Sequence, residues 1–206
     1  LPAPTLPGIA NNYVTAPTFI DNYNSFDVRI DQIIGTKDQL FGRYSYNYHD
    51  QLHSGPFPGY ADGGNSLVNS NLDDRSQNLV IGETHVFSPS VVNEFRIGGN
   101  REHALWLQPF GNEAGIPAQF GIQGVPQAPQ NGGLPGFSVG AISHFGSSGS
   151  LPSNKYGTVP QLNDDLTYLH GVHTFKFGFE GQQVRSPFHQ PPNSRGSFYY
   201  SGLYTS

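Results

Sequence analysis

The stretch at 164–181 limits the possible fold more than any other, because it alternates strictly around a tight reversal at 170–173. After the reversal, Phe175, Phe177 and Phe179 are separated by single polar or glycine residues. This period of two predicts a strand with one apolar face. A glycine in the reversal can supply the positive φ that a short hairpin loop needs. A soluble sandwich alternates in the same way, so the hairpin alone leaves the partner of its apolar face open.

The same alternation recurs along the chain and predicts an all-β fold, an antiparallel meander of about seven strands. After an extended entry segment at 1–21, strands are expected near 22–33, 39–50, 73–87, 91–107, 161–170, 174–185 and 196–203. Long loops rich in Gly, Pro and Asn are expected at 51–72, 108–160 and 186–195, within a partial β-barrel that covers 22–206.

The connections between these strands run short, long, short, long, short, long. A loop of about 50 residues counts against an ordinary compact domain, in which connections are mostly short. Outer-membrane β-barrels instead carry short turns at one rim and long loops at the other. Strands of about 10 to 16 residues also suit tilted strands that cross a bilayer, whereas globular strands are usually shorter. The order of the connections therefore predicts strands from a transmembrane β-barrel.

Composition excludes several other classes of protein. The chain has 206 residues with 26 Gly and 17 Pro, and good helix formers are scarce, which disfavours a helical fold. Its formal charge is −5 and Lys and Arg do not cluster, so a nucleic-acid partner is not expected. There is no Cys for a disulfide or a thiolate metal site. No apolar run reaches the roughly 20 residues of a membrane helix.

Several phrases of the sequence resemble the barrel of TonB-dependent outer-membrane receptors. The closest branch is the Oar-like receptors, which carry a carboxypeptidase-regulatory-like domain. The phrases are NSFDVRID at 24–31, TKDQLFGRYSY at 36–46, GVHTFKFGFE at 171–180 and RGSF at 195–198. The resemblance covers roughly residues 20–107 and 161–204, and the long loops stay unassigned. The order of the phrases along the chain makes the resemblance specific.

The resemblance implies a barrel of about 22 strands that spans the bacterial outer membrane and is filled by a plug domain. It further implies ligand capture by the long loops, followed by passage when TonB pulls on the plug. We expect this sequence to be a fragment of such a receptor, because it shows about seven strands and no plug, TonB box or regulatory-like domain. Its partners would be outer-membrane lipid and, through the missing plug, TonB.

An alternative from a different class of function stays open. Seven strands leave two unpaired edges, and an open edge is a template for pairing with another chain. Copies joined edge to edge would form a ring or, where the contact does not close, a filament. The alternative is therefore a self-assembling secreted or cell-surface fibre subunit derived from such a barrel, with copies of itself as the partner. The two hypotheses differ in whether the apolar strand faces meet lipid or protein.

Candidate contact residues follow from these hypotheses. Tyr60 in the first long loop, Trp106 near the end of a strand and Phe110 just beyond it are candidates for ligand contact. For Trp106 the preferred interpretation is an interfacial membrane anchor. The side chains expected to face lipid or a partner chain are Phe175, Phe177 and Phe179.

Catalytic and metal chemistry is not expected. The adjacent carboxylates at 73–74 and 164–165 point to opposite sides of a strand, so neither pair forms a shared acid–base site. His170 and His173 bracket a turn whose polarity explains them, and the other histidines lack a ligand spacing such as His-Glu-x-x-His. No nucleophile elbow is present. The sequence predicts a protein that is not an enzyme and has no cofactor or metal.

Overall fold

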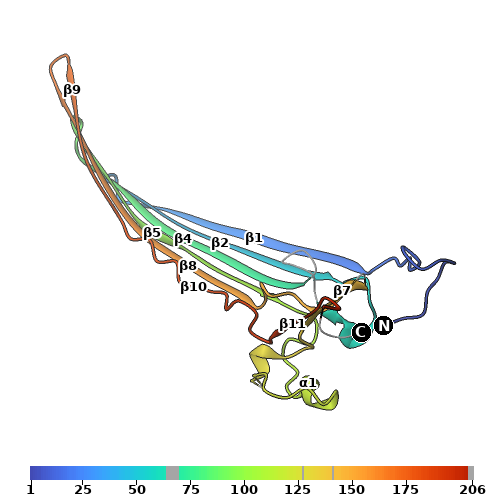
Figure 1. Cartoon of the computed structure of the whole chain (residues 1–206). Coiled ribbons are helices and arrows are strands. Elements are labelled where there is room, and N and C mark those ends of the chain that lie inside the picture. Colours follow the sequence, from blue (N-terminus) through green and yellow to red (C-terminus); the bar gives the residue numbers. More distant parts are fainter. Residues whose placement is uncertain (64–69, 127, 141, 204–206) are drawn as a thin grey trace.

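The main feature of the structure, a computed structural model that describes residues 1–63, 70–126, 128–140 and 142–203, is one large open sheet (Figure 1). Its long strands are β1 (Phe19–Ile34), β2 (Asp38–His53), β4 (Asn71–Ser88), β5 (Val91–Leu107), β8 (Ser153–His170) and β9 (His173–Gln182). The short strand β10 (Phe188–His189) pairs with the start of β8 and completes seven strands. All neighbouring pairs in this sheet are antiparallel, which confirms the predicted fold class.

The connections alternate in length. Residues 35–37, 89–90 and 171–172 join three pairs of long strands as tight turns. Gly35 and Gly171 adopt φ values of 61° and 59°, a conformation that glycine reaches without steric cost. The described parts of the long segments 54–70 and 108–152 lie at the other end of the sheet, where Figure 1 shows the loops gathered. The sheet therefore has a short-turn rim and a long-loop rim.

The long loops fold together into a unit of their own, called here the loop module, formed by the described parts of 54–70, 108–152 and 190–203. A second, four-stranded sheet lies in it, in the order β11–β6–β7–β3. Its strands are β3 (Asp62–Gly63), β6 (Gly136–Val139), β7 (Ile142–Ser147) and β11 (Ser197–Tyr200). Three short helices, η1 (Gly59–Ala61), α1 (Ile116–Gln119) and η2 (Pro129–Asn131), complete the described part of the module. The described parts of the loops thus pack against one another.

The start of β8 differs from the boundary expected from the sequence. The strand was expected from residue 161 but begins at Ser153. Pro160 breaks the sequence pattern, since proline cannot donate a ladder hydrogen bond. The strand nevertheless continues, because the Pro160 carbonyl accepts a hydrogen bond from the Gln183 N–H (3.1 Å) and the N–H of Thr158 donates to the Arg185 carbonyl (2.8 Å). Pairing on both sides of the proline holds the chain extended.

The last two expected strands also differ. The strand expected at 174–185 ends at Gln182, and the one expected at 196–203 is only the four residues of β11. β11 does not extend the large sheet but pairs in parallel with β6 in the loop module. The Phe198 ring stacks on Phe137 with ring centroids 5.2 Å apart, which holds β11 there. Of the expected loop at 51–72, residues 64–69 lie outside the described residues.

Burial is concentrated near the long-loop rim. The buried apolar side chains are Leu72, Ala104, Ile116, Leu134 and Leu151. The first two lie at the loop ends of β4 and β5, and the other three lie in the loop module. By contrast, every residue of β1 and nearly every residue of β9 is exposed. A water-soluble layered domain would cover at least one face of such strands. The large sheet therefore presents apolar side chains that need another partner.

Close contact between β4 and β5 yields a test of this pairing. A Cβ added at Gly98 would lie 2.4 Å from the Leu79 carbonyl oxygen, whereas one added at Gly42 would meet nothing within 4 Å. We therefore expect Gly98→Ala to lower the free energy of unfolding by about 1–3 kcal/mol because of overpacking against backbone. Gly42→Ala, the matched control in β2, should change it by less than about 0.5 kcal/mol. Urea unfolding in detergent, followed by circular dichroism, measures both, and equal effects would contradict the observed pairing.

Candidate functional site

The strand register divides the large sheet into two chemically different faces. Residues that are direct cross-strand partners share a face. One row of partners runs from Val28 through Tyr44, Leu79 and Gly99 to Pro160. The face that contains this row is called here the apolar face. Its apolar side chains include Phe26, Val28, Ile30, Leu40, Tyr44, Tyr46, Leu79, Ile81, Phe95, Ile97, Leu162, Leu166, Phe175, Phe177 and Phe179.

These apolar side chains form a belt that crosses the strands diagonally. In β1 the belt is centred on Val28, and the row of cross-strand partners that starts there reaches Pro160 in β8. In β9 the belt is centred on Phe177, whose partner in β8 is Leu166. The centre of the belt thus shifts by about six residues, or about 20 Å along the strand direction, over five strand-to-strand steps. These five steps span about 24 Å across the sheet. A level belt then requires a strand tilt of about 40°, within the range of about 35–45° found in transmembrane barrels.

Polar side chains interrupt the belt toward the short-turn rim. Asp164 lies on the apolar face between Phe95 and Phe179 of the neighbouring strands. Its Oδ1 accepts a hydrogen bond of 2.7 Å from the Asn93 side chain. Pairing lowers the cost of placing these polar groups beside apolar ones. The Asp164–Asn93 pair is therefore a hydrogen-bonded polar interruption of the belt.

The opposite face, called here the polar face, carries ion pairs. Arg29 contacts Asp31 at 2.6 Å and Arg96 contacts Glu94 at 2.8 Å, each pair within one strand. Lys155 of β8 contacts Glu102 of β5 at 3.2 Å. Such surface pairs contribute little to stability individually. The apolar face also carries an ion pair, Arg75–Asp73 (2.9 Å), but near the long-loop rim. Charged pairs level with the belt, such as Arg29–Asp31, are found on the polar face, which suits the water-facing inner wall of an outer-membrane barrel.

Phe175, Phe177 and Phe179 lie together on the apolar face of β9. Their side chains are 44%, 61% and 65% exposed. No described part of the chain covers these three side chains. They are therefore available for contact either with lipid or with a partner chain. Their contact with lipid or with a partner stays a prediction.

Tyr60 and Phe110 meet in the loop module, although 50 residues separate them in the sequence. Their ring centroids are 4.9 Å apart in an edge-to-face arrangement, and the Tyr60 ring also lies 6.1 Å from that of Phe120. Tyr60 lines a hollow of about 360 Å³. The other lining residues are Leu1, Pro58, Ala61, Phe120, Ile122, Leu134, Phe137 and Phe145. This apolar, aromatic hollow is of the kind that receives small ligands.

Trp106 does not join this aromatic group. It lies in β5 with Leu72 of β4 and Ser153 of β8 as its cross-strand partners, both of them buried. The register places it on the polar face, with Glu102, rather than on the apolar face. If the apolar face meets lipid, Trp106 points away from the lipid; its role as an interfacial anchor stays a prediction. Trp106 and Ile97 are separated by an odd number of positions in one strand, so the alternation of side chains already predicts from the sequence that they point to opposite faces.

A buried arginine ties the segments of the loop module together. Arg195 is only 2% exposed, and its Nη2 donates to the carbonyls of Ser148 (2.9 Å) and Leu151 (2.8 Å). Burial lowers the pKa of this guanidinium to about 10. Since the group remains charged at neutral pH, its hydrogen bonds to carbonyls offset part of the cost of burial. The residue holds the segment before β11 against the 148–151 turn, beside the hollow's walls from β6 and β7.

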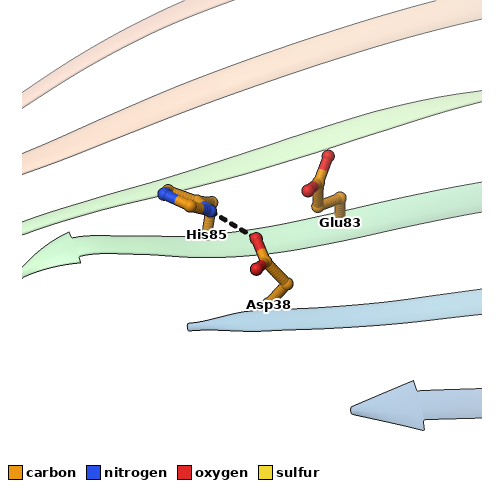
Figure 2. A group of neighbouring side chains, drawn as sticks. All are labelled: Asp38, Glu83 and His85. Atoms are coloured by element: carbon orange, nitrogen blue, oxygen red, sulfur yellow. Dashed lines mark hydrogen bonds and ion pairs between the residues drawn. The ribbon is translucent and has the colours of Figure 1, made fainter. Parts of the chain in front are cut away.

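One group of three side chains among the described residues could hold a metal ion. Asp38, Glu83 and His85 lie near the short-turn rim on the apolar face, with their donor atoms all within 4.8 Å of one another (Figure 2). The sequence does not bring this group together, because Asp38 and His85 are neighbours only through the register of β2 and β4. The Glu83–x–His85 spacing, which puts both side chains on one face of a strand, was the available signal.

Comparison with known proteins gives one family. The model of the outer membrane beta barrel domain matches residues 1–206. A search of curated proteins and a search of solved structures each returned no match. Among the described residues, no helix has the length and apolar character needed to cross a membrane.

The two faces of β9 can be tested with one type of substitution. Phe177→Arg puts a charge at the centre of the apolar belt and should cost about 2–4 kcal/mol of insertion into lipid vesicles. Thr174→Arg puts the same side chain on the polar face of the same strand and should cost much less. Folding into vesicles in a urea series, read by heat-dependent mobility on gels, measures both. Equal losses for the two variants would rule out lipid contact restricted to the apolar face.

Proposed function

Because the chain belongs to the family of outer membrane β-barrel domains, we propose that it forms part of the barrel of a TonB-dependent, Oar-like receptor that takes up a ligand. Family membership supports a location in the bacterial outer membrane. The finer assignment is supported by the phrases at 24–31, 36–46 and 171–180, which resemble those receptors. The proposed role is one of capture and passage, and no catalytic step belongs to it.

The observation that carries this proposal is the aromatic hollow at the long-loop rim. In outer-membrane barrels, long loops lie on the extracellular side and short turns on the periplasmic side. A ligand approaching from outside would therefore meet the loop module before it met the sheet. Tyr60 and Phe120 offer ring faces and edges in the hollow, whose lining is mostly apolar. We infer that the ligand carries an apolar or aromatic group that fits about 360 Å³.

The proposal assigns a partner to each face of the large sheet. Lipid would cover the apolar face, whose belt runs at a tilt suited to a bilayer. The ion pairs of the polar face would line the water- or plug-filled interior. TonB would act through a plug domain carried elsewhere in the receptor, and this sequence would supply wall and loops rather than the energised part.

An alternative function is favoured by the open edge of β1. Within the described residues, β1 is paired only with β2, and all of its 16 residues are exposed. An edge of this length is a template for strand addition. Copies of the chain could join through such edges as a cell-surface fibre, and the apolar face would then be covered by protein. In a receptor, the same edge would pair with the next strand of the barrel wall.

Electron microscopy of native material distinguishes the two functions. We expect the protein in the outer-membrane fraction and, after extraction, as detergent-dependent single particles whose intact mass exceeds that of the 206 residues. Ordered filaments or rings without detergent, with an intact mass near 22.4 kDa, would refute the receptor proposal and support the fibre.

The hollow itself can be tested with indole as an aromatic probe. Tyr60→Ala removes one aromatic wall, and because an aromatic pair contributes about 0.5–1.5 kcal/mol, binding should weaken about two- to tenfold. Tyr199→Ala, at a tyrosine of the loop module that does not line the hollow, is the matched control. Saturation-transfer NMR titrations in lipid nanodiscs measure both dissociation constants. Equal affinities in both variants and the unmodified chain would mean that the hollow is not the binding site.

A further inference from the structure

Asp38, Glu83 and His85 come together because of strand pairing at the short-turn rim. Asp38 is the first residue of β2 and is the direct cross-strand partner of His85 in β4. Glu83 precedes His85 by two residues, so both side chains leave β4 on the apolar face. Figure 2 shows Asp38 reaching from β2 toward β4, where its oxygen contacts the His85 Nδ1, while Glu83 stands over β4 beside them.

The spacing of the donor atoms suits a single ion. One nitrogen and two carboxylate oxygens lie within 4.8 Å of one another. Ligands bound at about 2.0–2.2 Å in a tetrahedral arrangement lie about 3.4 Å apart. The Asp38 oxygen and the His85 Nδ1 are in direct contact, so an ion would replace that contact as the two atoms separate, and the Glu83 carboxylate would turn toward it. The Glu83 side chain has several rotatable bonds, whereas the paired backbone of β2 and β4 can stay in place.

The types of donor indicate the class of ion. An imidazole nitrogen with two carboxylate oxygens suits Zn²⁺ and neighbouring first-row divalent ions, whereas Ca²⁺ and Mg²⁺ prefer oxygen ligands alone. With neutral His85, the three side chains carry a formal charge of −2, which a divalent cation would neutralise. The ring of His85 packs edge-on against Phe87 with centroids 4.3 Å apart, which restrains the imidazole. Restraint of a ligand's orientation favours binding.

The group lies between the centre of the belt and the short-turn rim. The belt shifts by about six residues over five strand-to-strand steps, so its centre on β4 lies near Ile81, about four residues before His85. At a tilt of about 40°, this places His85 about 10 Å from the middle of the membrane, inside an apolar band about 25 Å tall and toward its short-turn edge. The side chains of His85 and Asp38 are 30% and 29% exposed. This partial exposure leaves an ion a route to the two side chains from the short-turn rim.

We propose that Asp38, Glu83 and His85 form a binding site for Zn²⁺ or a similar divalent ion at the short-turn rim, where the ion links β2 to β4. This site is separate from the aromatic hollow, which lies at the opposite rim, and it does not depend on the transport proposal.

Calorimetric titration tests the site directly. The full chain, folded in detergent and freed of metal with EDTA, is titrated with ZnCl₂. We expect saturable binding of one equivalent. Glu83→Gln and His85→Gln each remove a ligand, and the affinity should fall at least about tenfold in each. His103→Gln is the matched control, because His103 lies on the apolar face near the other rim, stacked on Tyr156.

A second measurement needs no variant. Co²⁺ added to the unmodified chain should develop visible ligand-field absorption of a site with mixed nitrogen and oxygen ligands, and Zn²⁺ should abolish it. Absence of both saturable heat and Co²⁺ absorption would refute the proposal. Unchanged Zn²⁺ affinity in His85→Gln and Glu83→Gln would also refute it, provided that circular dichroism shows unchanged strand content. The heat of binding would then come from Zn²⁺ bound at other histidines.

Discussion

Backbone pairing between long antiparallel strands is the constraint on which the rest of the structure depends. Each strand satisfies its N–H and C=O groups through its neighbours, so the sheet needs no second layer to complete its hydrogen bonds. The register of these pairs fixes the face of every side chain, and a slip of one residue would exchange the two faces. The diagonal apolar belt, the ion pairs opposite it and the Asp38–His85 contact all follow from this register.

The two rims of the sheet have different physical roles. Tight turns at one rim leave little chain there, so its chemistry comes from side chains at the strand ends, such as Glu83 and His85. All of the long connections meet at the other rim, where they bury Ile116 and Leu151 and form a small sheet of their own. The buried Arg195 links two of these segments through backbone carbonyls. Binding surfaces can therefore vary in the loops while the paired strands remain unchanged.

Much of the architecture could be predicted from the sequence because a strand's alternation is a local property. The hairpin around Gly171 and the order of short and long connections led to an antiparallel, barrel-type sheet, and the structure and the family match agree with it. Predictions from local patterns were wrong where long-range contacts decided the structure. Pro160 suggested a loop, but hydrogen bonds of Pro160 and Thr158 to the 183–185 segment keep it within β8. The residues around Phe198 suggested another barrel strand, but aromatic stacking holds them in the loop module.

The sequence by itself determined that the chain forms strands, that each strand has an apolar and a polar side, and that long loops meet at one rim. A period of two and the length of a connection are properties of consecutive residues, so they can be identified without knowing any distant contact. Only the tertiary structure decided that Tyr60 meets Phe110 and that Asp38 lies against His85. These contacts join residues 50 and 47 positions apart. The first depends on how the loops pack together, and the second on a register set by hydrogen bonding along whole strands, which no short stretch specifies.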